Sequence, residues 1–269
     1  MQTASDDWLG LAGKIVVVTG AAGGIGQAIV RGFAAAGCIL VLLERDPALC
    51  ASLVTELEAT GIRAISLAAD VSSEASIRSA ANEIASILGP VGILVNNAGI
   101  LRPGSLEALS LDEWNLVLNV NLTGYFLCAQ IFAEQMKEAG GGAMVHIGSV
   151  AGEFPQPHSG AYSVAKAGVH MLSRLIAVEM GPAGIRSNVI SPAMVITPMS
   201  VRSYADPDLR RSREEMVPSR RIGMPEHMAD AAVWLASDRA AYVNGIEVPV
   251  DGALPRNLLG FIPRPGFSA

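Results

Sequence analysis

The sequence predicts an α/β protein built on a doubly wound parallel sheet, with helices on both of its faces. Short β-branched runs alternate with segments of helical periodicity along the whole chain, which is typical of a parallel sheet. The first run leads directly into a glycine-rich turn and then into a helical pattern. Hydrophobic residues make up 51% of the chain, which suits a sheet that is buried on both faces.

Each expected strand is short and apolar, and each is followed by a turn and then by a helix-like stretch. The expected strands are 14–19, 38–44, 63–68, 93–95, 143–147, 185–190 and 246–250. The expected helices are 27–36, 47–60, 73–88, a long one over 110–136, one from about 160, and 225–237. No repeat, linker or low-complexity stretch divides the 269 residues, so we expect one domain over 1–269.

Composition narrows the class of function. The formal net charge is −6, from 19 basic and 25 acidic residues, which argues against a nucleic-acid surface. No uninterrupted apolar run approaches the ~18 residues of a membrane span, and the N-terminus lacks a secretory pattern. Neither the three cysteines nor the four histidines have metal-ligand spacing, so we expect no metal and a cytoplasmic protein with reduced thiols. Small-molecule chemistry is the better expectation.

The glycine-rich turn is the first candidate site. Gly20, Gly24, Ile25 and Gly26 lie between the first strand and the first helix, directly after Thr19. Glycines let the backbone approach a pyrophosphate, and the helix N-terminus supplies N–H donors. A glycine cluster alone is often only a flexible loop, but here the strand before it and the helix after it favour a phosphate cradle.

The second candidate site lies in 148–166, which reads GSVAGEFPQPHSGAYSVAK. Tyr162 and Lys166 are four residues apart and share one face of a helix, while Ser149 ends the preceding strand. A lysine cation beside a phenol favours the phenolate, so the pair can exchange a proton that Ser149 helps to position. Such a pair is more often an ordinary half-buried aromatic beside a solvated stem, and the other motifs decide between the two.

The motif TGAAGGIG, together with Ser149, Tyr162 and Lys166, resembles the short-chain dehydrogenase/reductase family over about residues 11–253. The resemblance implies about seven strands, a Rossmann-type fold, NAD(H) across the strand ends and a homodimer or homotetramer formed through the two long central helices. It also implies that Asn121 is a catalytic residue that opens its helix locally and holds a proton-relay water. Asn119 is then a neutral neighbour.

The resemblance also implies a set of cofactor-binding residues. Glu44 can accept hydrogen bonds from a ribose 2′-hydroxyl and would repel a 2′-phosphate, which favours NAD, although Arg45 could bind that phosphate. Asp70 is expected to contact the adenine; alternatively it caps the next helix. The remaining expected cofactor contacts are Val71, Asn97, Ala98, Gly99, Tyr162, Lys166, Pro192, Val195 and Thr197. Ala193 departs from the Pro-Gly that relatives usually carry here, and Ile196 would face the nicotinamide beside Thr197.

The reaction implied is the reversible, NAD-dependent oxidation of a secondary alcohol to a ketone. Tyr162 is the acid/base, Ser149 polarises the oxygen, Lys166 lowers the tyrosine pKa, and Asn121 carries the proton relay. Two alternatives remain open. One is an NADPH-dependent ketone or 3-oxoacyl reductase, which Arg45 would support. The other is a non-catalytic nucleotide sensor, which is disfavoured because all four residues are present.

Three further segments carry hypotheses. A substrate flap is expected over about 194–225, with poor periodicity and arginines that either recognise an anionic substrate or form a solvated face. The apolar tail 254–269 is expected to pack on a neighbouring subunit. His158 either contacts substrate or lies on the surface. The arginines are Arg202, Arg210, Arg211, Arg213, Arg220 and Arg221.

Overall fold

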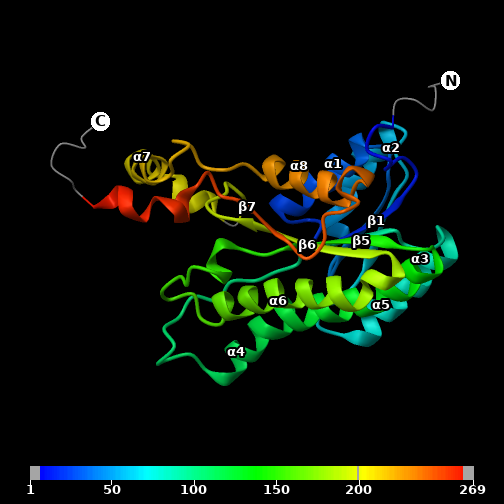
Figure 1. Cartoon of the computed structure of the whole chain (residues 1–269), viewed down its shortest axis with the longest axis horizontal. Helices are drawn as coiled ribbons and strands as arrows, with labels where there is room; N and C mark the ends of the chain where they lie inside the picture. Colours follow the sequence, from blue (N-terminus) through cyan, green and yellow to red (C-terminus); the bar gives the residue numbers. More distant parts are fainter. Residues whose placement is uncertain (1–6, 199, 263–269) are drawn as a thin grey trace.

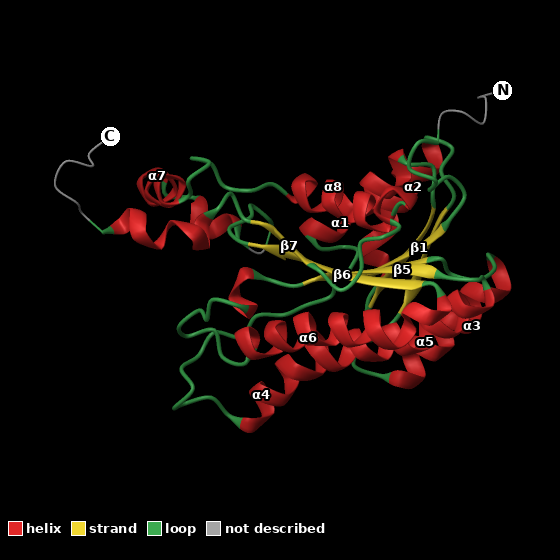
Figure 2. Cartoon of the chain, viewed as in Figure 1, coloured by secondary structure: helices red, strands yellow, loops and turns green. Residues whose placement is uncertain are grey.

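A computed structural model describes residues 7–198 and 200–262. In that part of the chain one parallel sheet has seven strands in the order β3-β2-β1-β4-β5-β6-β7. The sheet lies between two layers of helices (Figure 2). The predicted doubly wound α/β fold is confirmed. The strands are β1 Ile15–Thr19, β2 Ile39–Glu44, β3 Ala64–Ala68, β4 Ile93–Asn96, β5 Gly142–Ile147, β6 Ile185–Pro192 and β7 Glu247–Val250.

Helices cover both faces of the sheet (Figure 1). On one face lie α1 (Gly24–Ala35), α2 (Ala51–Ala59) and α8 (Pro225–Ala236). On the other lie α3 (Glu74–Ile87), α5 (Gly124–Glu138) and α6 (Tyr162–Met180), with α4 (Leu111–Leu118) beside them.

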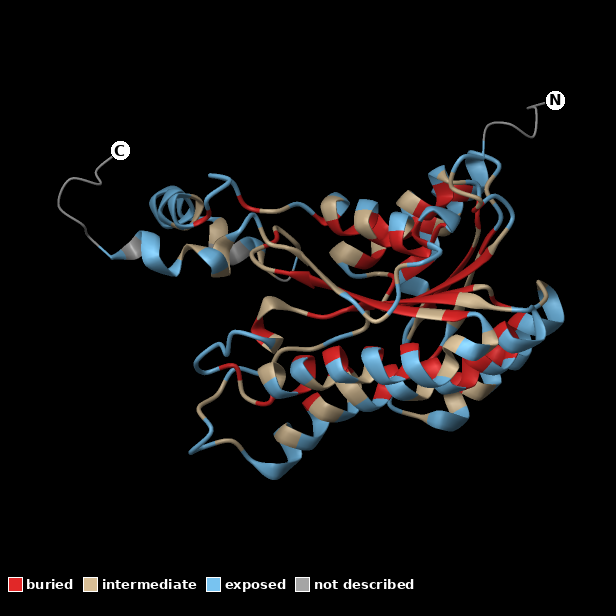
Figure 3. Cartoon of the chain, in the orientation of Figure 1, coloured by how far each residue is buried: buried red, intermediate tan, exposed pale blue. Residues whose placement is uncertain are grey.

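The core has two halves, one on each side of the sheet (Figure 3). Successive side chains of a strand point to opposite faces, so Val16 and Val18 pack towards α1 while Val17 packs towards the other layer. Phe33 fills the first half and Phe132 the second, and both are fully buried. Burial on both faces explains why the strands read as continuous apolar runs.

The strand order reverses direction at β1, which pairs with β2 on one side and β4 on the other. The connections from these strands leave on opposite faces, so a crevice opens at their carboxyl ends. The glycine-rich turn follows β1 at this point.

The long helix expected over 110–136 is not continuous. It is divided into α4, a π-helical turn at Asn119–Thr123, and α5. Ser110 caps α4, because its hydroxyl accepts from Glu113 N at 3.2 Å. The combined stretch Leu111–Glu138 is long and apolar enough to cross a membrane, but half of its most apolar window is buried inside this protein. In the structure it is a core helix of the second layer.

The flap differs from its expected irregularity. It contains α7 (Pro207–Met216), whose N-terminus is capped by Asp206 through Asp208 N at 2.9 Å. Proline at the first helical position and an acidic cap before it are ordinary helix-start signals. After β7, Leu254–Phe261 forms 3₁₀ turns, and the end of the predicted tail, 263–269, lies outside the described residues.

Candidate active site

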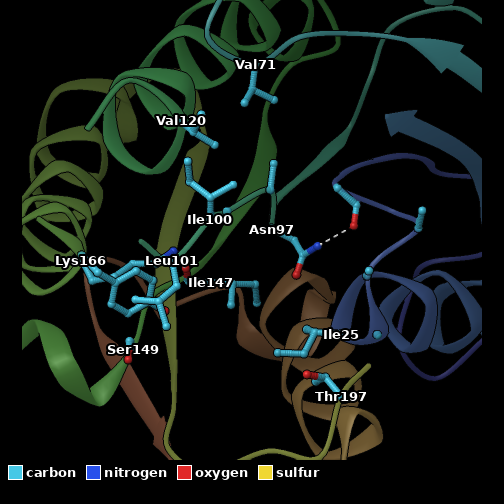
Figure 4. A pocket seen from close by; sticks show the side chains of 18 of the residues that line it. Ile25, Val71, Asn97, Ile100, Leu101, Val120, Ile147, Ser149, Lys166 and Thr197 are labelled. Atoms are coloured by element: carbon cyan, nitrogen blue, oxygen red, sulfur yellow. Dashed lines mark hydrogen bonds between the residues drawn. The ribbon is translucent and has the colours of Figure 1, made fainter. Parts of the chain in front are cut away.

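A cavity of about 820 Å³ lies along the carboxyl ends of the strands. Figure 4 shows Ser149, Leu101 and Lys166 gathered in one part of it and Val71 and Val120 in another. The structure brings every predicted cofactor residue to this cavity, together with three of the four predicted catalytic residues. These lining residues are Gly20, Gly24, Ile25, Gly26, Glu44, Asp70, Val71, Asn97, Ala98, Gly99, Ser149, Tyr162, Lys166, Pro192, Val195 and Thr197.

The glycine-rich turn has the shape of a phosphate cradle. Gly20 has φ +62°, and a Cβ there would lie 2.7 Å from Ala98 Cα. A Cβ on Gly24 would lie 2.7 Å from Pro198 Cδ, and one on Gly26 would overlap Gly20 O. No side chain caps the N-terminus of α1 at Gly23. Its backbone N–H groups are therefore available to an anion, and the residues present fit a dinucleotide pyrophosphate.

The segment Asn96-Asn97-Ala98-Gly99 (NNAG) ties two strand ends together. Asn97 Nδ2 donates to Thr19 O at 3.0 Å and to Gly20 O at 2.9 Å. Figure 4 shows one hydrogen bond of this amide at the cavity. Thr19 Oγ1 accepts from the backbone N–H groups of Asn97 and Ala98 at 3.0 and 3.1 Å. These bonds hold the floor of the cavity between β1 and β4.

Acidic side chains lie at the ends of β2 and β3. Glu44 Oε2 accepts from Ala22 N in the glycine-rich turn at 3.4 Å, which holds the carboxylate at the cavity wall. Asp70 Oδ1 accepts from Ser72 Oγ at 2.6 Å, and this bond, with Arg45 nearby, lowers the pKa of Asp70. The capping alternative for Asp70 is wrong, because Ser73 is the N-cap of α3.

Tyr162 and Ser149 lie side by side in the cavity. Burial raises the pKa of Tyr162 above its ordinary value, and the Ser149 hydroxyl acts in the opposite direction. Lys166 Nζ lies 5.7 Å from the Tyr162 ring centroid. Burial also lowers the pKa of Lys166 to about 7. The expected depression of the tyrosine pKa is therefore absent from this structure, because desolvation of the phenol is the larger effect.

Tyr125 is the partner of Lys166 that the sequence did not indicate. Lys166 Nζ donates to Tyr125 Oη at 3.1 Å and to Ile147 O at 2.7 Å. The Tyr125 ring is fully buried and stacks on His146, with ring centroids 6.0 Å apart. His146 Nδ1 accepts from Asn96 Nδ2 at 3.1 Å, and burial lowers the pKa of this histidine to about 3, so it is neutral. A buried polar network of Tyr125, His146 and Asn96 thus holds the Lys166 side chain in place.

Asn121 lies behind the cavity wall, on the π-helical turn. Its Oδ1 accepts from Ile100 N at 2.9 Å and its Nδ2 donates to Ile100 O at 2.8 Å. The helix is opened locally at this residue, as the resemblance implied, and the amide clamps the segment that follows NNAG.

Among the flap arginines whose side chains the structure describes, none lines the cavity; these are Arg210, Arg211, Arg213, Arg220 and Arg221. Arg210 pairs with Glu214 at 2.9 Å, and the guanidinium of Arg213 lies 5.1 Å from the Tyr204 ring centroid. His158 is exposed with φ +58° and does not line it either, nor does Ile196. Ala193 lines the cavity with an ordinary negative φ, so its Cβ is tolerated there.

The sequence did not indicate that Arg102 and Gln156 would lie at the cavity wall. Both come from loops, in which sequence pattern does not show which way a side chain points.

The fold and this cavity together define a Rossmann-type dinucleotide-binding oxidoreductase, and comparison with known proteins gives the family. A family model described as enoyl-(acyl carrier protein) reductase matches residues 20–254. The chain belongs to the short-chain dehydrogenase/reductase family.

Named relatives are dehydrogenases that act on alcohols. The D-threitol dehydrogenase of Mycolicibacterium smegmatis is 37% identical over 242 residues, covering 90% of this chain and 93% of that protein. The 3beta-hydroxysteroid dehydrogenase 1 of Eggerthella lenta is 38% identical, covering 91% and 94%. Among solved structures, a gluconate 5-dehydrogenase from Burkholderia cenocepacia in complex with NADP and tartrate aligns with a TM-score of 0.88 at 32% identity, covering 93% and 98%. The chain is an alcohol oxidoreductase of this family.

Proposed function

We propose that this protein is an NAD(H)-dependent enzyme that interconverts a secondary alcohol and a ketone, with Tyr162 as the acid/base. One observation carries the proposal: Tyr162 and Ser149 line the same cavity as the glycine-rich turn, at the reversal point of the sheet. A bound nucleotide with its phosphates at Gly24–Gly26 would extend along this cavity towards the tyrosine. A secondary alcohol is the substrate that such an arrangement can oxidise.

The chain's own residues manage the proton. Ser149 Oγ donates a hydrogen bond to the substrate oxygen and orients it, and Tyr162 Oη takes the hydroxyl proton during oxidation. Lys166, as a cation, favours the Tyr162 phenolate, which is the form that accepts this proton. NAD supplies the hydride-accepting chemistry when it is bound. Asn121 holds the π-helical turn open and keeps the Ile100 segment in place, where the relay to solvent would pass.

Glu44 supports the preference for NAD. Its carboxylate is fixed beside the glycine-rich turn, where it would accept hydrogen bonds from a ribose 2′-hydroxyl and repel a 2′-phosphate. NADP is the second candidate, because Arg45 also lines the cavity and the gluconate 5-dehydrogenase neighbour is a complex with NADP. A ketone or 3-oxoacyl reductase would then be the corresponding activity.

The test is binding and turnover with NAD⁺ and NADP⁺ over a panel of cyclic alcohols, sugar alcohols and β-hydroxyacyl compounds. We expect tighter NAD⁺ binding, and NAD⁺-dependent turnover that Tyr162→Phe lowers at least ~1000-fold by removing the acid/base. NAD⁺ binding should be retained in that variant. Turnover that survives Tyr162→Phe would contradict the mechanism. Tight nucleotide binding without turnover on any panel member would favour the sensor alternative.

The proposal also covers the oligomeric state and the cellular location of the protein. The protein would act as a homodimer or homotetramer on a small-molecule alcohol or ketone, with the tail 254–269 packed on a neighbouring subunit. A truncation at Leu254 that left oligomeric state and activity unchanged would contradict that role of the tail. A cytoplasmic location is supported by Cys38, Cys50 and Cys128, which are buried and free.

A further inference from the structure

We propose that Arg102 recognises an anionic group of the substrate, so that the preferred substrate is a hydroxy acid whose carboxylate lies away from the reacting alcohol. The inference rests on the proposed function, since it takes Ser149 and Tyr162 to mark the reacting end of the cavity. It assigns a substrate class to that end.

The acidic side chains of the cavity wall lie on one side of it only. Glu44 ends β2 and Asp70 follows β3 on one side of the sheet, and Arg45 lines the cavity beside them. On the other side of the sheet, Ser149 follows β5 and Pro192 ends β6. Among the described residues, no acid lines the cavity on this second side, and its lining cations are Lys166 and Arg102. An anionic substrate group is therefore favoured there.

The Lys166 ammonium already has hydrogen-bond partners inside the protein. Its Nζ donates to Tyr125 Oη and Ile147 O, and its side chain is buried. Arg102, in contrast, is an exposed residue, and within residues 7–198 and 200–262 it has no carboxylate partner within 4.0 Å. A guanidinium presents a planar fork of N–H donors that matches a carboxylate. Arg102 is the cation of this end that remains available to a ligand.

The backbone around Arg102 is held in place relative to Tyr162. Gly104 N donates to His158 O at 3.0 Å, and Gly160 N donates to Gly104 O at 3.0 Å, which joins the loop after β4 to the loop after β5. A Cβ on Gly160 would lie 2.5 Å from Arg102 O, so the two loops pack closely. The Tyr162 N–H in turn donates to Ser159 O at 3.1 Å. Two loops that are far apart in sequence thus form one wall.

The two joined loops also bring other side chains to the cavity wall. Gly104 is bridged to Ser159, and the two loops that lead to this bridge bring Arg102 and Gln156 to the cavity wall. The Gln156 amide adds a hydrogen-bond donor to this wall, and Leu101, next to Arg102 in sequence, adds an apolar surface. A ring or short carbon chain that carries both the alcohol and a carboxylate suits this combination.

The test compares two substrates that differ only in charge. The ratio of kcat/KM for 4-hydroxycyclohexanecarboxylate to that for its primary carboxamide is measured with NAD⁺ in wild type, R102Q and R102K. Arg210→Gln serves as the matched control, because Arg210 pairs with Glu214 outside the cavity. We expect R102Q to lower the ratio roughly tenfold to a hundredfold, which corresponds to the loss of one charge-assisted hydrogen-bonded pair. R102K should restore part of it, and R210Q should leave the ratio unchanged.

A binding measurement separates this inference from the proposed function. Calorimetry of cyclohexanecarboxylate, which has no reacting hydroxyl, is carried out on the NAD-loaded protein and its variants. Binding that R102Q weakens at least tenfold supports the anion site even if no alcohol turns over, in which case the proposed function alone fails. Turnover that depends on Tyr162, with a ratio that R102Q leaves unchanged or lowers no more than R210Q does, overturns the role of Arg102. Absence of both carboxylate binding and a charge-dependent ratio overturns it as well.

Discussion

Lys166 is a buried amine, and its burial makes the stability of the protein depend on pH. Burial lowers its pKa from 10.5 to about 7. In the unfolded chain the amine keeps its ordinary pKa, so between about pH 7 and pH 10.5 the unfolded state binds the extra proton. Stability therefore rises with pH across this window, and below about pH 7 the full penalty for the buried cation is present.

The first prediction concerns Lys166→Met. Methionine removes the buried charge, while Ile147 O keeps the hydrogen bond from Tyr125 Oη at 3.1 Å. We expect the variant to exceed wild type by about 2 kcal/mol in unfolding free energy at pH 6, with the advantage shrinking towards pH 10. Urea denaturation at several pH values measures it. Lys137→Met, at an exposed lysine, should show no such pH dependence, and a pH-independent difference for Lys166→Met would refute the argument.

The second prediction concerns Tyr125, which accepts a hydrogen bond from Lys166. Phenylalanine removes this acceptor, so the protonated form of Lys166 is less stable. With less positive charge beside it, the Tyr162 phenolate is also less stable, and the pKa of Tyr162 rises. We expect Tyr125→Phe to move the acid limb of the kcat/KM profile up by about 0.5–1 pH unit and to lower stability by about 1 kcal/mol. Tyr242→Phe is the control, since Tyr242 is fully exposed. A loss of stability with an unchanged pH profile would assign Tyr125 a structural role only.

Arg102 and Tyr125 show why part of the site could not be predicted from the sequence. Most of the predicted cofactor residues lie directly after a strand or at the start of a helix. Because the carboxyl ends of parallel strands meet at one edge of the sheet, the local sequence pattern was sufficient to place these residues. Tyr125 looked like one more apolar position of a core helix, and its partners lie 22 and 41 residues away. Arg102 is positioned by a contact between two loops, which no periodicity encodes.

At the scale of elements, the strand–turn–helix unit at β1 and α1 is packed so closely that its turn has no room for a side chain at Gly26. Gly26 packs against Gly20 O, and a Cβ there would also lie 2.9 Å from Ala21 Cα and Asn97 Nδ2. The same close approach opens the N-terminus of α1 to the cavity. The unit was fully predictable because glycine spacing, strand and helix pattern all agree.

The third prediction is that Gly26→Ala lowers affinity for the nucleotide at least tenfold and destabilises the protein by about 2 kcal/mol, since the turn must move to admit the methyl group. Gly92→Ala is the matched control, because the nearest atom to its Cβ would be Ile15 O at 4.0 Å. Fluorescence titration and thermal unfolding measure the two effects. Equal behaviour of the two variants would show that the turn accommodates a side chain.

The helix α7 shows the opposite case, an element that sequence pattern missed. It has no buried residue, so it carries none of the apolar periodicity that predicts a helix. Its described support is local: the Asp206 cap, proline at the first position and the Arg210–Glu214 pair. Start signals alone predict such a helix better than periodicity does.

At the scale of the whole molecule, α6 presents an apolar stripe that nothing in the described chain covers. Val164, Met171, Leu175 and Val178 are 48%, 60%, 51% and 75% exposed, and they recur at helical spacing. Phe126 on the neighbouring α5 is 44% exposed. A contiguous apolar surface of this kind is a protein–protein contact in most soluble proteins. A second copy of the chain, with its own α5 and α6 face, is the partner that the proposed dimer requires.

The last prediction tests this surface. Met171→Glu combined with Val178→Glu places charges in the stripe, and burying them in a symmetric interface would bring like charges together. We expect the wild type to sediment as a dimer or tetramer and the double variant to shift to a smaller species. Leu49→Glu, at a residue 61% exposed before α2, should leave the assembly intact. A wild type that is already monomeric at micromolar concentration, or a double variant that keeps its size, would show that α6 is not the interface.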